Sequence, residues 1–285
     1  MSETPAIWIN GELMAADKVL VSPFDLGLRV GLGVFETMVA YHGKVFAYDL
    51  HHRRMERAAE VLGIPVPEKD VIEQAMEAVI AQQTHRAPRL RIRVSLSGGD
   101  NTLEGGEKQG DLMVSAAVIQ SDQHAGKLAK LVKVPYTVNE QAATAGLKTA
   151  SYADYVLAYR YALKRGGDEA LMLNTRGQVC EAAMSNLFLV KDGVVKTPTH
   201  SSGCLAGVTR ELVMGQCLKL GLPIKECELT EEDVLAADEL MLTSSVREVQ
   251  GAVMIQNEQQ HDTCGELTTK LAAAYAEFVR EELAR

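Results

Sequence analysis

Residues 146–186 place a lysine and a carboxylate on either side of one short run of predicted structure. Lys148 comes just before a helical pattern over Tyr155 to Leu163, and a strand-like run over Glu169 to Asn174 follows that helix. Glu181 comes after the strand and a turn. We therefore interpret the stretch as one structural unit in which an amine and a carboxylate can meet across a ligand.

Lys148 lies among small and apolar residues. Ala145, Gly146 and Leu147 precede it, and the next charged residue is Asp154. An ammonium group in such surroundings loses solvation, which favours the neutral, nucleophilic amine that can form an imine with an aldehyde. Most lysines are solvated surface charges, so an exposed Lys148 stays the alternative.

Glu181 is the matching carboxylate. A carboxylate beside a pyridine nitrogen keeps that ring protonated and able to accept the electrons left when a substrate carbon loses its proton. The alternative is an exposed glutamate at a strand end, the usual position of this residue type. Together Lys148 and Glu181 predict a cofactor that has both an aldehyde and a ring nitrogen.

Composition limits the classes of protein to which this chain can belong. Its 285 residues suffice for two compact units, and its apolar (47%) and charged (24%) fractions are those of a globular protein. The net charge of −9 argues against a nucleic-acid partner, which would require a basic surface. No apolar run approaches the roughly 20 residues that span a bilayer, so we expect no membrane partner.

The five cysteines are scattered and include no C-x-x-C pair. They predict free thiols in a reducing compartment. The residues Met1 to Pro5 lack the basic start and apolar core of a signal peptide, so we expect a cytoplasmic protein. No metal site is predicted, and the adjacent His51 and His52 are interpreted as structural residues.

Residues 1–119 are predicted to form a small α/β domain. Asn10-Gly11 and His42-Gly43 are two-residue turn signals for hairpins. The other predicted elements are helices over Asp49 to Leu62 (capped by Asp49) and Asp70 to Gln82, and strands over Arg89 to Ser95 and Leu112 to Ile119.

A Gly-x-Gly pattern at Gly31 and Gly33 is typical of dinucleotide-binding turns. Glu36 stands where that motif needs its third glycine, and no helical pattern follows, so we exclude this function. The polar, aperiodic segment 120–126 is the best linker in the chain. It separates the small domain from a larger one over residues 127–285.

The larger domain has its own turn and cap signals. Lys191-Asp192-Gly193 predicts a hairpin, and Thr230 with Asp233 forms a capping-box pattern. The other predicted elements are a loop over Thr197 to Gly203, a helix over Thr209 to Leu220, a strand over Glu239 to Thr243 and a final helix with Leu267, Leu271, Ala274 and Phe278 on one side.

Six segments carry recognisable patterns: 33–37 (GVFET), 51–55 (HHRRM), 147–152 (LKTASY), 181–186 (EAAMSN), 205–210 (LAGVTR) and 243–249 (TSSVREV). In this order they resemble the fold-type IV pyridoxal-phosphate enzymes, which include the branched-chain and D-amino-acid aminotransferases and aminodeoxychorismate lyase. The resemblance implies an α/β (α+β) fold with a small N-terminal domain, a larger C-terminal domain and pyridoxal 5'-phosphate in the cleft. It also implies a homodimer whose partner chain completes the pocket.

By this resemblance Lys148 forms the Schiff base with the cofactor and Glu181 pairs with the pyridine nitrogen. Ser151 stands where relatives often have Asn, and Ala182 where they usually have Gly. The LAGVTR segment precedes a predicted helix, whose N-terminal N–H groups suit a phosphate. The implied cofactor-binding residues are Arg54, Lys148, Glu181, Ser185, Asn186, Leu205, Gly207, Val208, Thr209, Ser244 and Ser245.

Substrate recognition is less strongly indicated. By the resemblance Phe35 lines the pocket, and Thr37 corresponds to a threonine with which the lyase members handle a substrate proton, which makes it a third catalytic candidate. Arg91 and Arg93 are candidates for a substrate carboxylate, although a solvated strand face explains both equally well.

We therefore predict an aminotransferase that moves an amino group from an amino acid to a 2-keto acid through Lys148. The main alternative is aminodeoxychorismate lyase, which releases pyruvate and leaves 4-aminobenzoate; Thr37 favours it. A third hypothesis is a catalytically silent pyridoxal-phosphate-binding protein, and the presence of both Lys148 and Glu181 argues against it. The preferred amino donor and its handedness are not determined by the sequence.

Overall fold

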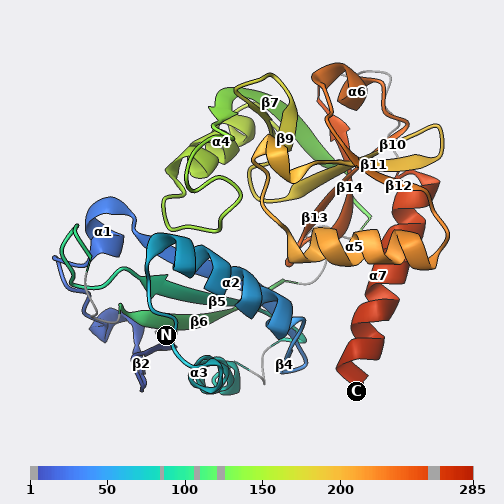
Figure 1. The fold of residues 1–285 in the computed structure, drawn as a ribbon. Coiled ribbons are helices and arrows are strands. Elements are labelled where there is room, and N and C mark those ends of the chain that lie inside the picture. The colour runs from blue at the N-terminus through green and yellow to red at the C-terminus, as the bar shows by residue number, and fades with distance from the viewer. Residues whose placement is uncertain (1–5, 84–86, 106–109, 121–125, 256–263, 285) are drawn as a thin grey trace. The chain divides into compact units, whose positions relative to one another are not determined.

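The computed structural model describes residues 6–83, 87–105, 110–120, 126–255 and 264–284 (Figure 1). The chain divides into two compact units: Met1–Ser121 with Lys148–Ser151, and Asp122–Leu147 with Tyr152–Arg285. The short segment that begins at Lys148 thus belongs to the first unit, although its sequence neighbours on both sides belong to the second. Most of the predicted linker, residues 121–125, lies outside the described residues.

An antiparallel sheet in the strand order β2-β1-β6-β5-β3-β4 forms the centre of the first unit. Both predicted hairpin turns are confirmed, and Asn10-Gly11 and His42-Gly43 have the positive φ values that such turns need. The described elements are β1 (Ala6–Ile9), β2 (Glu12–Ala15), the 3-10 helix η1 (Ala16–Lys18), α1 (Leu26–Val30), β3 (Gly33–Tyr41), β4 (Lys44–Val45), α2 (Tyr48–Leu62), α3 (Lys69–Ala81), β5 (Arg89–Ser97) and β6 (Leu112–Val118).

The start of α2 differs from the prediction. Ala47, with a φ of 54°, occupies the N-cap without a side-chain hydrogen bond, so the prediction that Asp49 caps the helix is wrong. Asp49 lies in the first turn, where its charge interacts favourably with the helix dipole. Gly63 ends the helix in the left-handed conformation, as its position in the sequence predicts.

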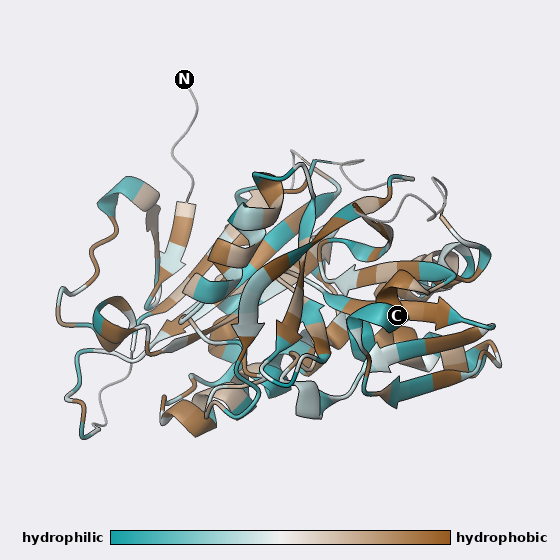
Figure 2. Cartoon of the chain, turned by 90° about the horizontal axis from the view of Figure 1, so that it is seen from above, coloured by the Kyte–Doolittle hydropathy of each residue, from teal (hydrophilic) through white to brown (hydrophobic). Residues whose placement is uncertain are grey.

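Alternation along the strands gives the first sheet two different faces. Met38 and Ile92 are fully buried, and Glu36 on the same face contacts His51 of α2, so α2 covers this face. The opposite face carries Arg93, whose side chain is exposed. Figure 2 shows apolar and polar residues alternating along the strands.

The second unit is built on a mixed sheet in the order β12-β11-β10-β13-β14-β7-β8-β9. Strand pairs β11–β12, β14–β7 and β7–β8 are parallel, and the other pairs are antiparallel. The described elements are β7 (Ala129–Val138), α4 (Ala153–Leu163), β8 (Glu169–Asn174), β9 (Val179–Ala182), β10 (Asn186–Lys191), β11 (Val194–Pro198), the 3-10 helix η2 (His200–Ser202), α5 (Val208–Lys219), β12 (Ile224–Cys227), α6 (Glu231–Leu235), β13 (Glu239–Ser244), β14 (Glu248–Met254) and α7 (Glu266–Ala284).

Residues from distant strands of this sheet pack into one core. Val179 of β9, at the end of the strand order, clusters with Leu187 of β10 and Leu242 of β13, so the sheet curls around these side chains. A second cluster joins Ala158 of α4 to Met172 of β8. Helix α4 therefore packs on the strands that lead to Glu181.

Most elements that the sequence predicts in this unit are confirmed, including the Lys191–Gly193 hairpin and the Thr230–Asp233 capping box. Strand β7 was not predicted. Lys130 and Lys133 interrupt its apolar residues, and Pro135 is unfavourable in an inner strand. The structure accommodates Pro135 because the pairing of β7 with β8 shifts register between Lys133 and Thr137.

Candidate active site

Lys148 is held by backbone pairing with β3. The N–H of Phe35 donates to the carbonyl of Lys148 (3.1 Å), and the N–H of Ala150 donates to the carbonyl of Gly33 (2.7 Å). The segment Lys148–Ser151 thereby adds a short extended stretch to the start of β3, which fixes the backbone of Lys148 beside that strand.

The ring of Phe35 contacts two cationic side chains. Lys148 Nζ lies 4.4 Å from the ring centroid, and Arg93 Cζ lies 3.9 Å from it. Thr37 is directly opposite Arg93 in the β3–β5 register, and Arg91 lies one alternation further along the same face. The structure therefore brings the predicted substrate residues Phe35, Thr37, Arg91 and Arg93 together on one face, with Lys148 beside Phe35.

Arg54, the predicted phosphate ligand from α2, is bound to the buried Glu36. Its Nε donates to Glu36 Oε1 (2.8 Å) and its Nη2 donates to Oε2 (2.6 Å), while His51 Nδ1 lies 2.8 Å from Oε2. Burial alone raises the pKa of Glu36, but the charges and hydrogen bonds of Arg54 and His51 outweigh it and hold that pKa well below its usual range. Glu36 is thus ionised and orients the guanidinium of Arg54.

Glu181 lies in β9 of the second unit, with 4% of its surface exposed. Its Oε1 accepts a hydrogen bond from the Tyr155 hydroxyl (3.0 Å), and its Oε2 accepts from Asn186 Nδ2 (3.2 Å) and from the N–H of Leu205 (3.0 Å). Three uncharged donors from three segments therefore fix a buried carboxylate in one orientation.

Asn186 joins Glu181 to the start of α5. Its amide also donates to the carbonyl of Leu205 (2.9 Å), and a Cβ at Gly207 would lie 1.9 Å from Asn186 Oδ1, so only glycine fits there. Gly207 is the N-cap of α5 and makes no side-chain capping bond. The first N–H groups of α5, from Val208 onward, are thus available to an anion.

The β13–β14 turn comes to the same place because Asn186 pairs with Thr243 across the sheet. Ser244 and Ser245 follow Thr243, and Ser244 Oγ accepts a hydrogen bond from the N–H of Arg247 (3.2 Å). The buried hydroxyls of Ser185 and Thr243 have no hydrogen-bond partner among the described residues. Unsatisfied buried hydroxyls beside an uncapped helix start fit a phosphorylated ligand.

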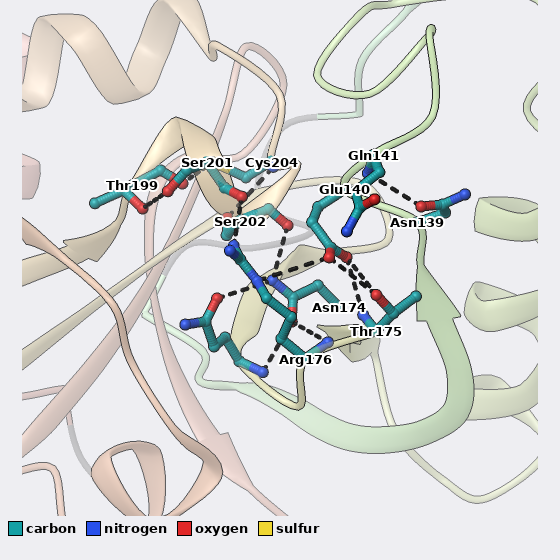
Figure 3. Close-up of polar contacts among 11 residues, drawn as sticks. Asn139, Glu140, Gln141, Asn174, Thr175, Arg176, Thr199, Ser201, Ser202 and Cys204 are labelled. Carbon is teal, nitrogen blue, oxygen red and sulfur yellow. Dashed lines mark hydrogen bonds and ion pairs between the residues drawn. The ribbon is translucent and has the colours of Figure 1, made fainter.

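A polar network holds the β8–β9 turn that precedes Glu181 (Figure 3). Glu140 accepts hydrogen bonds from the N–H (3.1 Å) and hydroxyl of Thr175, and Asn174 Oδ1 accepts from the N–H of Arg176 (3.0 Å). Arg176 Nη2 reaches the carbonyl of Ser201 (2.8 Å). The turn is thus fixed both to the segment before Lys148 and to the loop before Leu205.

Sequence reasoning missed Tyr155 as a contact of Glu181, and it missed the supporting Glu140. The available signal was the spacing of Tyr152 and Tyr155, which puts two phenols on one turn of a predicted helix. Within the described residues no group of three or more His, Cys, Asp or Glu residues is arranged to hold a metal ion. None of the described helices is long and apolar enough to cross a membrane.

A fixed buried carboxylate, an uncapped helix start and unsatisfied hydroxyls define an enzyme that binds a phosphorylated, nitrogen-containing ring. Residues 33–255 match the family model described as Amino-transferase class IV. The chain is also 32% identical to a putative branched-chain-amino-acid aminotransferase of Methanocaldococcus jannaschii, over 95% of this chain and 96% of the relative. The chain therefore belongs to the class IV aminotransferase family.

Other relatives carry both of the activities considered above. An aminodeoxychorismate lyase of Bacillus subtilis is 29% identical over 96% of this chain and 94% of its own length. The structure of a branched-chain aminotransferase from Thermoproteus uzoniensis with norvaline is similar at a TM-score of 0.86, with 28% identity over 96% of this chain and 94% of that one.

A branched-chain aminotransferase from the organism abbreviated T.th., solved with pyridoxamine 5'-phosphate, matches at a TM-score of 0.85, with 26% identity over 97% of this chain and 94% of that one. These similarities confirm the predicted fold-type IV architecture and the prediction of a class IV enzyme with pyridoxal phosphate as its cofactor.

Proposed function

We propose that this chain is an aminotransferase in which Lys148 holds the cofactor covalently and Glu181 holds its ring nitrogen. The observation that carries this proposal is the geometry of Glu181, whose buried carboxylate is fixed by Tyr155, Asn186 and Leu205. A carboxylate kept ionised in such a place needs a positively charged partner, and a protonated ring nitrogen meets that need.

The chain's own residues divide the work. Bound pyridoxal phosphate supplies an electron sink for the substrate carbon. Lys148, once displaced by the substrate amine, takes the proton from the substrate's Cα and returns it on the cofactor side. The ring of Phe35 contacts the lysine chain end and limits its orientations.

Phosphate binding falls to groups that the structure leaves available. We assign it to the N–H groups of Val208 and Thr209 at the start of α5, to the hydroxyls of Ser244 and Ser245, and to Arg54. The uncapped Gly207 and the unsatisfied hydroxyl of Thr243 support this assignment.

Aminodeoxychorismate lyase is the second candidate. Thr37 lies opposite Arg93 on the substrate face, where its hydroxyl is placed to handle a proton next to a guanidinium that suits a carboxylate. The Bacillus subtilis relative supports the same candidate. A catalytically silent binding protein would have no need of both Lys148 and a fixed Glu181.

One spectroscopic experiment separates the three functions. Purified holoprotein is mixed with a panel of L- and D-amino acids while the cofactor absorbance is followed, and separately with aminodeoxychorismate without any keto acid. Conversion of the cofactor to its amine form by an amino donor supports the aminotransferase. Pyruvate release from aminodeoxychorismate supports the lyase, and no change with any compound supports the silent binding protein.

We also propose a cytoplasmic homodimer. The segment 20–30 exposes large apolar side chains in the isolated chain, and such a patch favours a protein partner; they are Leu20 (88%), Phe24 (63%), Leu28 (65%) and Val30 (53%). All five cysteines are free, which suits a reducing compartment. Light scattering at working concentration tests the dimer, and a monomeric mass would contradict it.

A further inference from the structure

Two tyrosines at the start of α4 reach both sides of the corner that follows β9. The rings of Tyr152 and Tyr155 stack, with centroids 4.6 Å apart and planes 14° apart. The Tyr152 hydroxyl donates to the carbonyl of Ala183 (3.1 Å), and the Tyr155 hydroxyl donates to Glu181 Oε1 (3.0 Å). The pair therefore binds the backbone of the corner with one phenol and the Glu181 carboxylate with the other.

The hydrogen bond from Tyr155 complements the bonds on the other carboxylate oxygen. Asn186 and Leu205, which follow Glu181 in the chain, donate to Oε2, whereas Tyr155 comes from α4 and donates to Oε1. Each oxygen is thus held by a different part of the fold. Rotation of the carboxylate about its terminal bond would break bonds on both sides.

The protonation state of Tyr155 suits a permanent donor. Burial raises its pKa, and the negative charge of Glu181 raises it further, so the phenol keeps its proton over the working range of an enzyme. A hydroxyl that stays protonated beside a carboxylate donates to it and withdraws part of its charge.

We propose that Tyr155 is a positioning residue that acts through Glu181: its hydroxyl fixes Oε1 and moderates the basicity of the carboxylate that holds the cofactor's ring nitrogen. The inference rests on the function proposed for Glu181. It adds that the strength with which the carboxylate holds the ring proton is set by a phenol on the helix that follows Lys148 in the chain.

The test is Y155F, which removes the hydroxyl and keeps the ring and its stack on Tyr152. Pyridoxal phosphate affinity is measured by equilibrium dialysis against the apoprotein, together with the pH midpoint of the bound cofactor's visible band, kcat and KM. Because a hydrogen bond to a charged group is lost, we expect affinity and kcat to fall about tenfold with KM for the amino donor unchanged, and the pH midpoint to shift.

Two matched controls use other phenols of α4. Y152F removes the bond to Ala183 and leaves Glu181 its contact with Tyr155, so we expect a smaller effect and an unchanged pH midpoint. Y161F alters a ring that packs edge-on against Tyr136 (5.7 Å between centroids), and we expect wild-type affinity and kcat.

A double-mutant cycle shows whether the hydroxyl acts through Glu181. In an E181A background Y155F should no longer change pyridoxal phosphate affinity. The proposal is overturned if Y155F behaves like Y161F, if its effect persists in E181A, or if Y155F fails to fold while Y161F folds, since the hydroxyl would then serve the fold. Failure of the proposed function is separate: E181A alone would then keep wild-type kcat and affinity.

Discussion

Each unit contains a buried glutamate that faces an arginine, and the two pairs behave differently. In the first unit Glu36 (1% exposed) accepts two hydrogen bonds from Arg54 and pairs with His51. In the second unit Glu169 (0% exposed) lies 3.3 Å from a single nitrogen of Arg247. The residue types and the burial are the same, and the number and length of the contacts differ.

These contacts decide the sign of each pKa shift. For Glu36 the attraction of Arg54 and His51 outweighs burial and lowers the pKa well below its usual range. For Glu169 burial dominates, Arg247 offsets only part of it, and the pKa rises to about 6. A buried carboxylate–arginine pair is therefore no single kind of interaction, and its effect on stability follows from its geometry.

Glu181 extends the comparison to a third buried carboxylate, one held by uncharged donors, and gives the largest expected effect. E181Q should reduce kcat on the order of a thousandfold, because an amide cannot keep the ring nitrogen protonated. Pyridoxal phosphate binding should remain, and the melting temperature should stay close to that of the wild type. Steady-state kinetics with the preferred donor checks this, and unchanged kcat would contradict it.

Breaking the pair in the first unit should cost stability. E36Q leaves the buried guanidinium of Arg54 without its anion, so we expect a loss of about 3 kcal/mol in the free energy of unfolding. Denaturant titration measures it, with the exposed α2 residue Glu60 changed to Gln as the control. Equal stability of E36Q and E60Q would refute the assigned role of the Glu36–Arg54 pair.

The two pairs should respond to pH with opposite signs. Between pH 4.5 and about 6 the folded chain binds more protons at Glu169 than the unfolded chain, so this contribution to stability is full below pH 4.5 and is lost as the pH rises through about 6. The contribution of Glu36 is full above its unfolded pKa of 4.5 and is lost at lower pH.

Stability measured against pH for E169Q tests this sign. The stability of the wild type relative to E169Q should increase by about 2 kcal/mol between pH 7 and pH 4.5. The exposed Glu228 changed to Gln serves as the control. A difference that stays constant, or that grows towards high pH, would show that the pKa of Glu169 is not raised.

The smallest effect is expected at the β13–β14 turn, which Arg247 links to Glu169. S244A removes one hydroxyl assigned to the phosphate, so we expect pyridoxal phosphate affinity to fall about fivefold, or roughly 1 kcal/mol. S201A, at an exposed serine of the same unit, is the control. An affinity equal to that of S201A would remove Ser244 from the phosphate site.

Local signals made much of this structure predictable from the sequence. The Asn10-Gly11 hairpin, the glycine that ends α2 and the Thr230–Asp233 capping box each depend on residues a few positions apart. The bounds of β8, Glu169–Asn174, agree with the prediction, because a turn and a helix end delimit its apolar run.

Contacts between distant parts of the chain were not predictable in this way. The pairing of the Lys148 segment with β3 joins residues far apart in sequence, and no pattern in either segment encodes it. The cap of α2 at Ala47 is imposed by the preceding hairpin, so the propensity of Asp49 did not decide it. The contact of Tyr155 with Glu181 depends on how α4 packs, which periodicity alone leaves open.

The most direct test of the account is to fix the cofactor to the lysine that carries it. Holoprotein is treated with borohydride and digested, and the labelled peptide is sequenced by mass spectrometry, with K148A as the control. We expect one pyridoxyl group on Lys148 in the wild type and none in K148A. A label on another lysine, or a wild-type chain that takes no label after loading with pyridoxal phosphate, would contradict the account.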